Sequence, residues 1–425
     1  MNKQEISERQ KLRIRKHPGL VLNDHNDMII EDIAASFLRK FMRLFIIEFY
    51  FNGCRQFEFT KKIDNSFEFK AFALNKWADI KDGDCDSWIY AFCTFCKEKD
   101  WSSNCSMFLD LTLDDVIRDK DIVGFDYLPI AQFISKYFDV SIIKDNYKQT
   151  TAHFEDGCFI DCNEENINPD INQTIIRFKF EEEIFAENIY TKNPYVSSED
   201  FYKIAQSLAM FFSGTEITIF DETEDKTIKK YYKYDSLSDY VAECFDYDNP
   251  WCFEFEACTD EMEKTQSNAL IKMALTPCET KGEFEMYCNY RKIEYGMQLK
   301  AIEKALSETN RNFNVIIIIF QKCTLWTNAM KRGIENQYIC DSVYNRLKEE
   351  ISKFLLWKKM LEYIKDRISL TAYELWIKTI KFHGISNGRA ILTFKSDVAE
   401  RMVFEQYTAL IQDAFLSVTG DNILI

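Results

Sequence analysis

A long, mostly apolar stretch near the start of the chain, residues 28–51, constrains the fold more than any other segment. A helix of this composition must be covered by other elements in a globular protein. It cannot cross a bilayer, because a spanning helix needs about 20 consecutive apolar residues. Six charged residues interrupt the stretch, namely Glu31, Asp32, Arg39, Lys40, Arg43 and Glu48. The stretch therefore predicts a buried or amphipathic helix, and no membrane contact is expected.

Length and composition predict a globular chain with more than one core. The sequence has 425 residues, of which 46% are hydrophobic and 15% aromatic, so it can bury sizeable cores and is not disordered. It is too long for a single core, and two to three domains are expected. The formal net charge of -16 disfavours direct binding to nucleic acid, because binding to the DNA backbone needs a basic surface.

The 14 cysteines are interpreted as free thiols in a reducing compartment. The polar start of the sequence shows no export signal, so a cytoplasmic location is expected. Four cysteines fall close together and could supply the ligands of a zinc site, namely Cys85, Cys93, Cys96 and Cys105. The apolar neighbours of Cys93 and Cys96 favour small buried side chains instead. No metal is predicted, and zinc at this cluster stays an open alternative.

Glycine is scarce. The chain has 12 glycines in 425 residues, about 3%, whereas ~7% is usual. Phosphate-binding loops need glycines so that backbone N–H groups can approach the ligand. Neither a Walker loop nor a Rossmann glycine fingerprint occurs in the sequence. The sequence therefore offers no standard phosphate-binding loop.

Strand and helix patterns divide the chain into three units, residues 1–195, 196–350 and 356–425. The first has helices layered on a largely antiparallel sheet. In this unit a helix is expected at 128–138, and strands at 56–59, 65–72, 140–143, 149–154 and 174–180. The second unit is α/β and opens with a helix whose N-cap is Ser197 and whose acidic partner is Asp200.

The end of the second unit and the third unit are predicted from apolar spacing and turn residues. An apolar run at 314–320 predicts a buried strand in the second unit. Helices are expected at 341–357, 357–368, 369–380 and 397–418, with a hairpin turn at 386–388 between the last two.

An ordered set of motifs over residues 14–350 resembles the N-terminal half of the DNA gyrase B family. The carrying segments are 15–19 (Arg-Lys-His-Pro-Gly), 51–54, 140–145, 153–157, 173–178, 208–219 and 232–241. The resemblance implies an α+β fold. Its parts would be a GHKL-like (Bergerat) α/β sandwich followed by a transducer-like α/β domain of the ribosomal S5 domain 2 type.

The catalytic residues of that ATPase family are missing at the matching positions. The family has a Glu that activates water and, four residues later, an Asn that holds Mg²⁺ against the phosphates. Here these positions are Lys40 and Leu44, and neither side chain can do that chemistry. The adenine-reading Asp and its Gly-x-Gly turn are replaced at 70–74, and only Gly124 remains of the glycine-rich lid. The resemblance therefore implies a degenerate ATPase with no catalytic residue.

Two residues match nucleotide-contacting positions of the family, Thr174 and Lys331. The alternative interpretations are an ordinary strand residue for Thr174 and a surface lysine for Lys331. No cofactor is expected, and ATP with Mg²⁺ is the alternative.

The C-terminal unit resembles domain I, the N-terminal domain, of the replication initiator DnaA. The carrying segments are 357–364, 373–377, 388–394 and 398–411. The resemblance implies a small KH-like α/β module that binds replication proteins and, weakly, itself. By this resemblance the contact face includes Val398, Ala399 and Glu400.

A DnaA-like interaction module beside a degenerate ATPase predicts a non-catalytic adaptor or regulator in DNA replication or topology. Its partners would be proteins of the replication or gyrase machinery, and a homodimer is possible. One alternative is a divergent, gyrase-B-like ATP-binding component of a type II DNA topoisomerase that lacks its own cleavage domain. Another, motivated by the net charge of -16, is an acidic protein that blocks gyrase.

Overall fold

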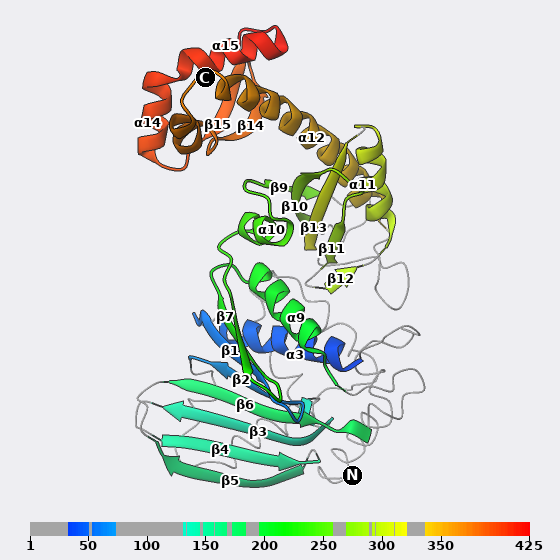
Figure 1. Ribbon diagram of the computed structural model, residues 1–425. Coiled ribbons are helices and arrows are strands. Elements are labelled where there is room, and N and C mark those ends of the chain that lie inside the picture. Colours follow the sequence, from blue (N-terminus) through cyan, green and yellow to red (C-terminus); the bar gives the residue numbers. More distant parts are fainter. Residues whose placement is uncertain are drawn as a thin grey trace, which may run out of the picture.

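The computed structural model describes most of the chain after residue 32. The described residues are 33–50, 53–73, 131–132, 134–144, 148–156, 158–167, 172–183, 195–257, 269–288, 291–293, 295–309, 311–320 and 336–425. They form an eight-stranded sheet, a five-stranded sheet and a C-terminal module, placed one after another along the molecule (Figure 1). Among the described helices, none is both long and apolar enough to cross a bilayer.

The first sheet has the strand order β5-β4-β3-β6-β2-β1-β7-β8. The strands are β1 (Gln56–Lys61), β2 (Ser66–Ala71), β3 (Ser135–Lys144), β4 (Lys148–Glu155), β5 (Cys158–Asn166), β6 (Gln173–Phe180), β7 (Glu216–Glu222) and β8 (Thr227–Tyr232). Neighbours are antiparallel except for β1 and β7, which are parallel. The helices α3 (Ile33–Tyr50) and α9 (Ser198–Phe211) lie side by side on this sheet (Figure 1).

Phenylalanine side chains form much of the core between the first sheet and α3. They lie on one face of the sheet, because alternate residues of a strand point to the same side. The ring of Phe41 lies 5.0 Å from the rings of Phe69 and Phe178, and Phe45 lies 5.6 Å from Phe69. Tilted and edge-to-face rings at these distances attract one another beyond their burial. Within the described part of the helix predicted at 28–51, residues 33–50, these apolar side chains are covered as expected.

The second sheet has the strand order β12-β11-β13-β10-β9. Its elements are α10 (Leu237–Phe245), β9 (Trp251–Ala257), β10 (Ala269–Cys278), β11 (Phe284–Cys288), β12 (Arg291–Ile293), α11 (Met297–Ser307) and β13 (Asn312–Phe320). One face of β13 joins α11 and α12, whereas Ile316 and Ile318 on its other face join the first core. A strand that is buried on both faces has a nearly continuous apolar sequence, as β13 has. The buried strand predicted at 314–320 is confirmed.

The C-terminal module begins on the long helix α12 (Gln337–Lys365). It continues with α13 (Leu370–Ala372), the π-helical turn η3 (Tyr373–Ile377), β14 (Lys381–Ser386), β15 (Arg389–Thr393), α14 (Asp397–Gln406) and α15 (Thr408–Thr419). The hairpin turns at Asn387 and Gly388, both with positive φ, as a two-residue turn of the mirror-image type requires. The predicted turn at 386–388 is confirmed.

Four helix predictions were wrong in their extent. The helix expected at 128–138 gives way to strand β3 from Ser135 onward, where alternate side chains are buried against the sheet. The helices expected at 341–357 and 357–368 are one continuous helix, α12, since no glycine, proline or cap separates them. The helix expected at 397–418 divides at Tyr407 into α14 and α15.

The first sheet extends past residue 196, where the sequence predicts the start of a second unit. Strands β7 and β8 lie beyond that position, yet β7 pairs with β1 from Gln56 to Lys61. The sheet and the predicted unit therefore do not coincide, and the division into residues 1–195, 196–350 and 356–425 stays a prediction.

Candidate functional site

The position predicted to match the family's metal-binding Asn is buried in apolar packing. Leu44 lies on α3, is 5% exposed and belongs to the first core. Its neighbours along the helix, Phe45 and Ile46, are buried in the same core. Lys40 lies on the same helix, and its side chain is outside the described parts. The Leu44 side chain therefore presents no atom that could hold Mg²⁺.

The segment that replaces the adenine-reading turn carries an ion pair. On β2 the Lys70 ammonium lies 3.2 Å from a Glu58 carboxylate oxygen and 3.7 Å from one of Glu68. Glu68 also accepts a hydrogen bond of 2.6 Å from Arg177 Nε on β6. The carboxylates here are engaged by basic side chains of neighbouring strands.

Thr174 is completely buried on β6, opposite Ala71 of β2. Its hydroxyl donates a hydrogen bond of 3.1 Å to the backbone carbonyl of Ala73. Thr174 on β6 and Leu44 on α3 both lie in the part of the fold that contains the first sheet. The Thr174 hydroxyl already has a hydrogen-bond partner within the fold. Its role toward a nucleotide stays a prediction.

Several predicted positions lie outside the described residues, namely Lys331, Gly124, Cys85, Cys93, Cys96 and Cys105. Within the described part, no group of three or more His, Cys, Asp or Glu side chains is placed to hold a metal ion. Six described cysteines are free thiols: Cys54, Cys244, Cys252, Cys278, Cys288 and Cys340. The expectation of free thiols fails at Cys162, which is disulfide-bonded.

A partly buried arginine lies where α3 meets the second sheet. Burial lowers the pKa of Arg39 below its ordinary value, while the nearby Tyr287 and Asp200 partly offset that effect. Tyr287 on β11 donates a hydrogen bond of 3.1 Å to Glu285, and Tyr240 on α10 donates another of 3.1 Å to the same oxygen. This junction is therefore polar, and the Glu285 carboxylate accepts both tyrosine hydrogen bonds in it.

The predicted contact residues of the C-terminal module lie in the first turn of α14. Ser396 caps this helix by accepting a hydrogen bond of 3.2 Å from the Ala399 backbone N–H. Val398 is 60% exposed and Glu400 is exposed, whereas Ala399 is buried. The structure therefore presents two of the three side chains on the surface.

Two further apolar side chains of the C-terminal module are exposed, and sequence reasoning missed them. Phe404 on α14 is 44% exposed, with its ring 5.7 Å from that of Phe394. Leu375 is exposed on η3, which packs against α14. We call Leu375, Val398 and Phe404 the module surface. Helical phase offers no signal that groups them, because Val398 and Phe404 flank the buried stripe of Ala399 and Val403 on opposite sides of α14.

The C-terminal module matches a known family. Residues 355–417 match the family described as DnaA N-terminal domain. A curated relative, the chromosomal replication initiator protein DnaA of Thermodesulfovibrio yellowstonii, is 28% identical over 74 residues. The match covers 17% of this chain and 16% of that relative. The resemblance predicted for the C-terminal unit is confirmed.

The chain is also similar in fold to a solved gyrase structure. The B-subunit of the DNA gyrase from Myxococcus xanthus has a TM-score of 0.55 at 12% identity, covering 81% of this chain and 95% of that one. The topoisomerase IV ATP binding domain of Francisella tularensis has a TM-score of 0.46 at 14% identity, covering 81% of this chain and 91% of that one. The α+β, gyrase-B-like fold predicted from sequence is confirmed by the first of these.

Proposed function

We propose that this protein is a catalytically inactive, gyrase-B-like scaffold that acts as an adaptor or regulator in DNA replication or topology. Its C-terminal module binds a protein of the replication or gyrase machinery in the cytoplasm. The observation that carries this proposal is the match of residues 355–417 to the DnaA N-terminal domain. The module surface adds exposed apolar side chains on that domain, which a protein partner could cover.

The loss of ATP hydrolysis is supported by the chemistry of α3. Phosphoryl transfer needs a residue that positions water and a metal bridging the phosphates. Leu44 has no ligand atom and its side chain fills the apolar core, and Lys40 cannot act as a carboxylate base. The protein therefore uses this unit as a scaffold.

Calorimetric titration of the full chain with a non-hydrolysable ATP analogue tests the loss of catalysis. We expect no binding in the micromolar range, with or without Mg²⁺. Micromolar, Mg²⁺-dependent binding would contradict the proposal and support an ATP-binding topoisomerase component instead. Light scattering in the same samples shows whether the analogue promotes a homodimer.

Affinity capture with purified replication and gyrase proteins tests the adaptor role. The variants Val398→Glu and Phe404→Glu place a charge on the module surface, so we expect each to lose at least tenfold in affinity, about 1.4 kcal/mol. The matched control is Leu416→Glu on α15, which is similarly exposed but lies outside the module surface. Equal binding by all four proteins, wild type included, would place the contact elsewhere.

A further inference from the structure

No loop separates the second sheet from the C-terminal module along α12. We call the junction between the two the seam. Helix α12 runs through without a break, as the brown helix of Figure 1 shows. Its residues Ile351 and Phe354 belong to the second core, and Trp357 and Met360, one turn later, belong to the third. The module is therefore attached by a helix, and its direction depends on what else holds it to the second sheet.

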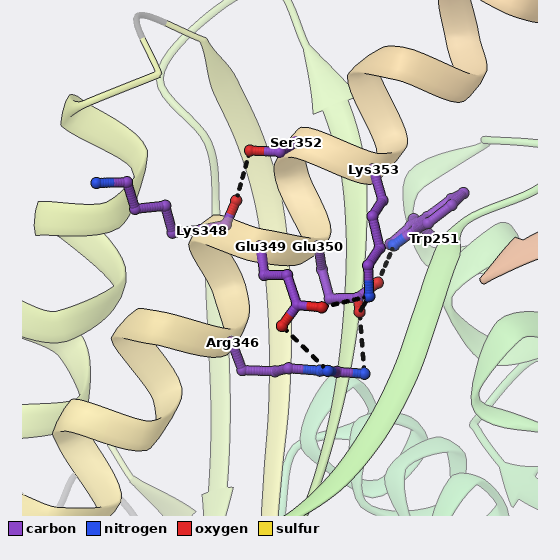
Figure 2. Close-up of polar contacts among 7 residues, drawn as sticks. All are labelled: Trp251, Arg346, Lys348, Glu349, Glu350, Ser352 and Lys353. Atoms are coloured by element: carbon purple, nitrogen blue, oxygen red, sulfur yellow. Dashed lines mark hydrogen bonds and ion pairs between the residues drawn. The ribbon is translucent and has the colours of Figure 1, made fainter. Parts of the chain in front are cut away.

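A buried carboxylate lies at this seam. Glu350 on α12 is 4% exposed. One of its oxygens accepts a hydrogen bond of 2.9 Å from the Trp251 indole N–H, and the other lies 2.9 Å from Lys353 Nζ and 3.0 Å from an Arg346 nitrogen (Figure 2). We call these four residues the Glu350 cluster. A buried charge is tolerated when it is paired and hydrogen-bonded, and both oxygens are engaged here.

Two members of the Glu350 cluster also contact the module. Trp251, at the start of β9, packs its ring 5.7 Å from that of Phe354 and lies against both the second and the third core. The stem of Lys353 lies against Gly384 of β14, where an added Cβ would sit 3.2 Å from Lys353 Cε. The cluster therefore joins the second sheet, α12 and the module hairpin.

A cavity lies beside the Glu350 cluster. It has a volume of about 910 Å³ and separates the second unit from the module, and its lining includes Trp251, Glu350, Trp357 and residues 381–383. Because this cavity lies between the second unit and the module, fewer apolar contacts hold the direction of the module there.

Another polar contact spans the seam, and it is weak. Lys378 lies 3.5 Å from an Asp248 oxygen, and its carbonyl accepts a hydrogen bond of 3.3 Å from the Asn249 amide. The Asp248 side chain is 92% exposed, and exposed ion pairs contribute little. The Glu350 side chain, in contrast, is only 6% exposed.

We propose that the Glu350 cluster fixes the orientation of the C-terminal module on the second sheet. With the carboxylate in place, Trp251 and Lys353 are held together and the module points in one direction. Without its charge the module rocks on α12 into the adjacent cavity, while each core stays folded. Buried polar groups can select one conformation in this way, at little gain in stability.

Single-molecule energy transfer on the full chain tests this orientation. The dyes are placed through non-canonical amino acids at Lys300 on α11 and Ser417 on α15, both exposed, so that the native cysteines remain. We expect one narrow distance distribution for the wild type. We expect Glu350→Gln, which keeps the shape but loses the charge, to broaden it or add a second population.

The matched control is Glu349→Gln. Glu349 pairs with the same Arg346 and Lys353, but its side chain is half exposed and it is not the carboxylate that Trp251 contacts. This variant should keep the wild-type distribution. An unchanged distribution for Glu350→Gln would overturn the proposal, as would equal broadening in both variants.

Two further measurements keep the test decisive. Circular dichroism shows whether Glu350→Gln folds, and if it does not, Trp251→Phe decides, because it keeps a ring and removes the donor. In that variant broadening supports the proposal and a wild-type distribution overturns it. High salt screens exposed charges. Broadening of the wild type at high salt would assign the orientation to Asp248 and Lys378 instead.

Discussion

At the scale of single residues, Leu44 and Thr174 show how the fold uses two positions that were predicted to match nucleotide-contacting positions of the gyrase B family. Leu44 was expected from its sequence position to lack metal-binding atoms, and it is buried in the first core. Thr174 has its hydroxyl bonded to Ala73, a contact across 101 positions that no local pattern could predict. Lack of a ligand atom follows from residue identity alone, whereas the partner that replaces the ligand depends on the fold.

Replacement of Leu44 by the family's own residue, Leu44→Asn, should destabilise the protein. An amide at this buried, apolar position loses apolar contacts and its hydration, so we expect a cost of about 2–4 kcal/mol in the free energy of unfolding. Urea unfolding measures it, with Val398→Asn at an exposed position as the control. A variant as stable as the wild type would mean that the space around residue 44 is loosely filled.

His153 on β4 should make stability depend on pH. Burial alone would lower its pKa, but Asp139 and Glu155 outweigh burial and raise it. A raised folded-state pKa adds stability below the unfolded value of about 6.5, and this is lost as pH rises through the folded value. The difference in unfolding free energy between wild type and His153→Gln should therefore be larger at about pH 6 than at about pH 8. A pH-independent difference in urea unfolding would contradict this.

At the scale of elements, the sequence predicts a helix start that a capping residue marks, but not where packing joins or divides helices. Ser197 was predicted as an N-cap, and its hydroxyl accepts a hydrogen bond of 3.0 Å from the Asp200 N–H. The end of α12 was misplaced because two amphipathic patterns follow each other without a break, each facing a different core. The helix predicted at 128–138 failed from Ser135, where pairing with β4 and β6 decides the conformation. Capping is local, whereas these outcomes depend on partners far along the chain.

The continuity of α12 can be tested at Ser352, an exposed residue in its middle. Proline there would remove the backbone N–H and clash with the preceding turn, so Ser352→Pro should cost about 3 kcal/mol or more in unfolding free energy. The control, Ser352→Ala, removes only the hydroxyl bond of 2.9 Å to the Lys348 carbonyl. It should change stability by less than about 0.5 kcal/mol. Thermal unfolding measures both, and a proline variant equal to the alanine one would contradict a continuous helix.

At the scale of the whole molecule, the decisive pairings join distant segments. Strand β7 pairs with β1 across about 160 positions, and this brings residues beyond 196 into the first sheet. The family resemblance predicted the class of fold, since ordered motifs survive at low identity. It could not predict the surface of the module, because exposure of Phe404 and Leu375 depends on how η3 packs on α14.

The first and second sheets should unfold together, because β13 contributes to both cores. Ile316 belongs to the first core and Ile317, its neighbour, to the second, and both are fully buried. Ile316→Ala and Ile317→Ala should each cost about 2–5 kcal/mol. In scanning calorimetry we expect both variants to shift one common transition to lower temperature. The control, Ile391→Ala on the half-exposed face of β15, should leave that transition in place. If the two variants instead moved two separate transitions, the cores would be independent, and contact between the sheets would not couple their unfolding.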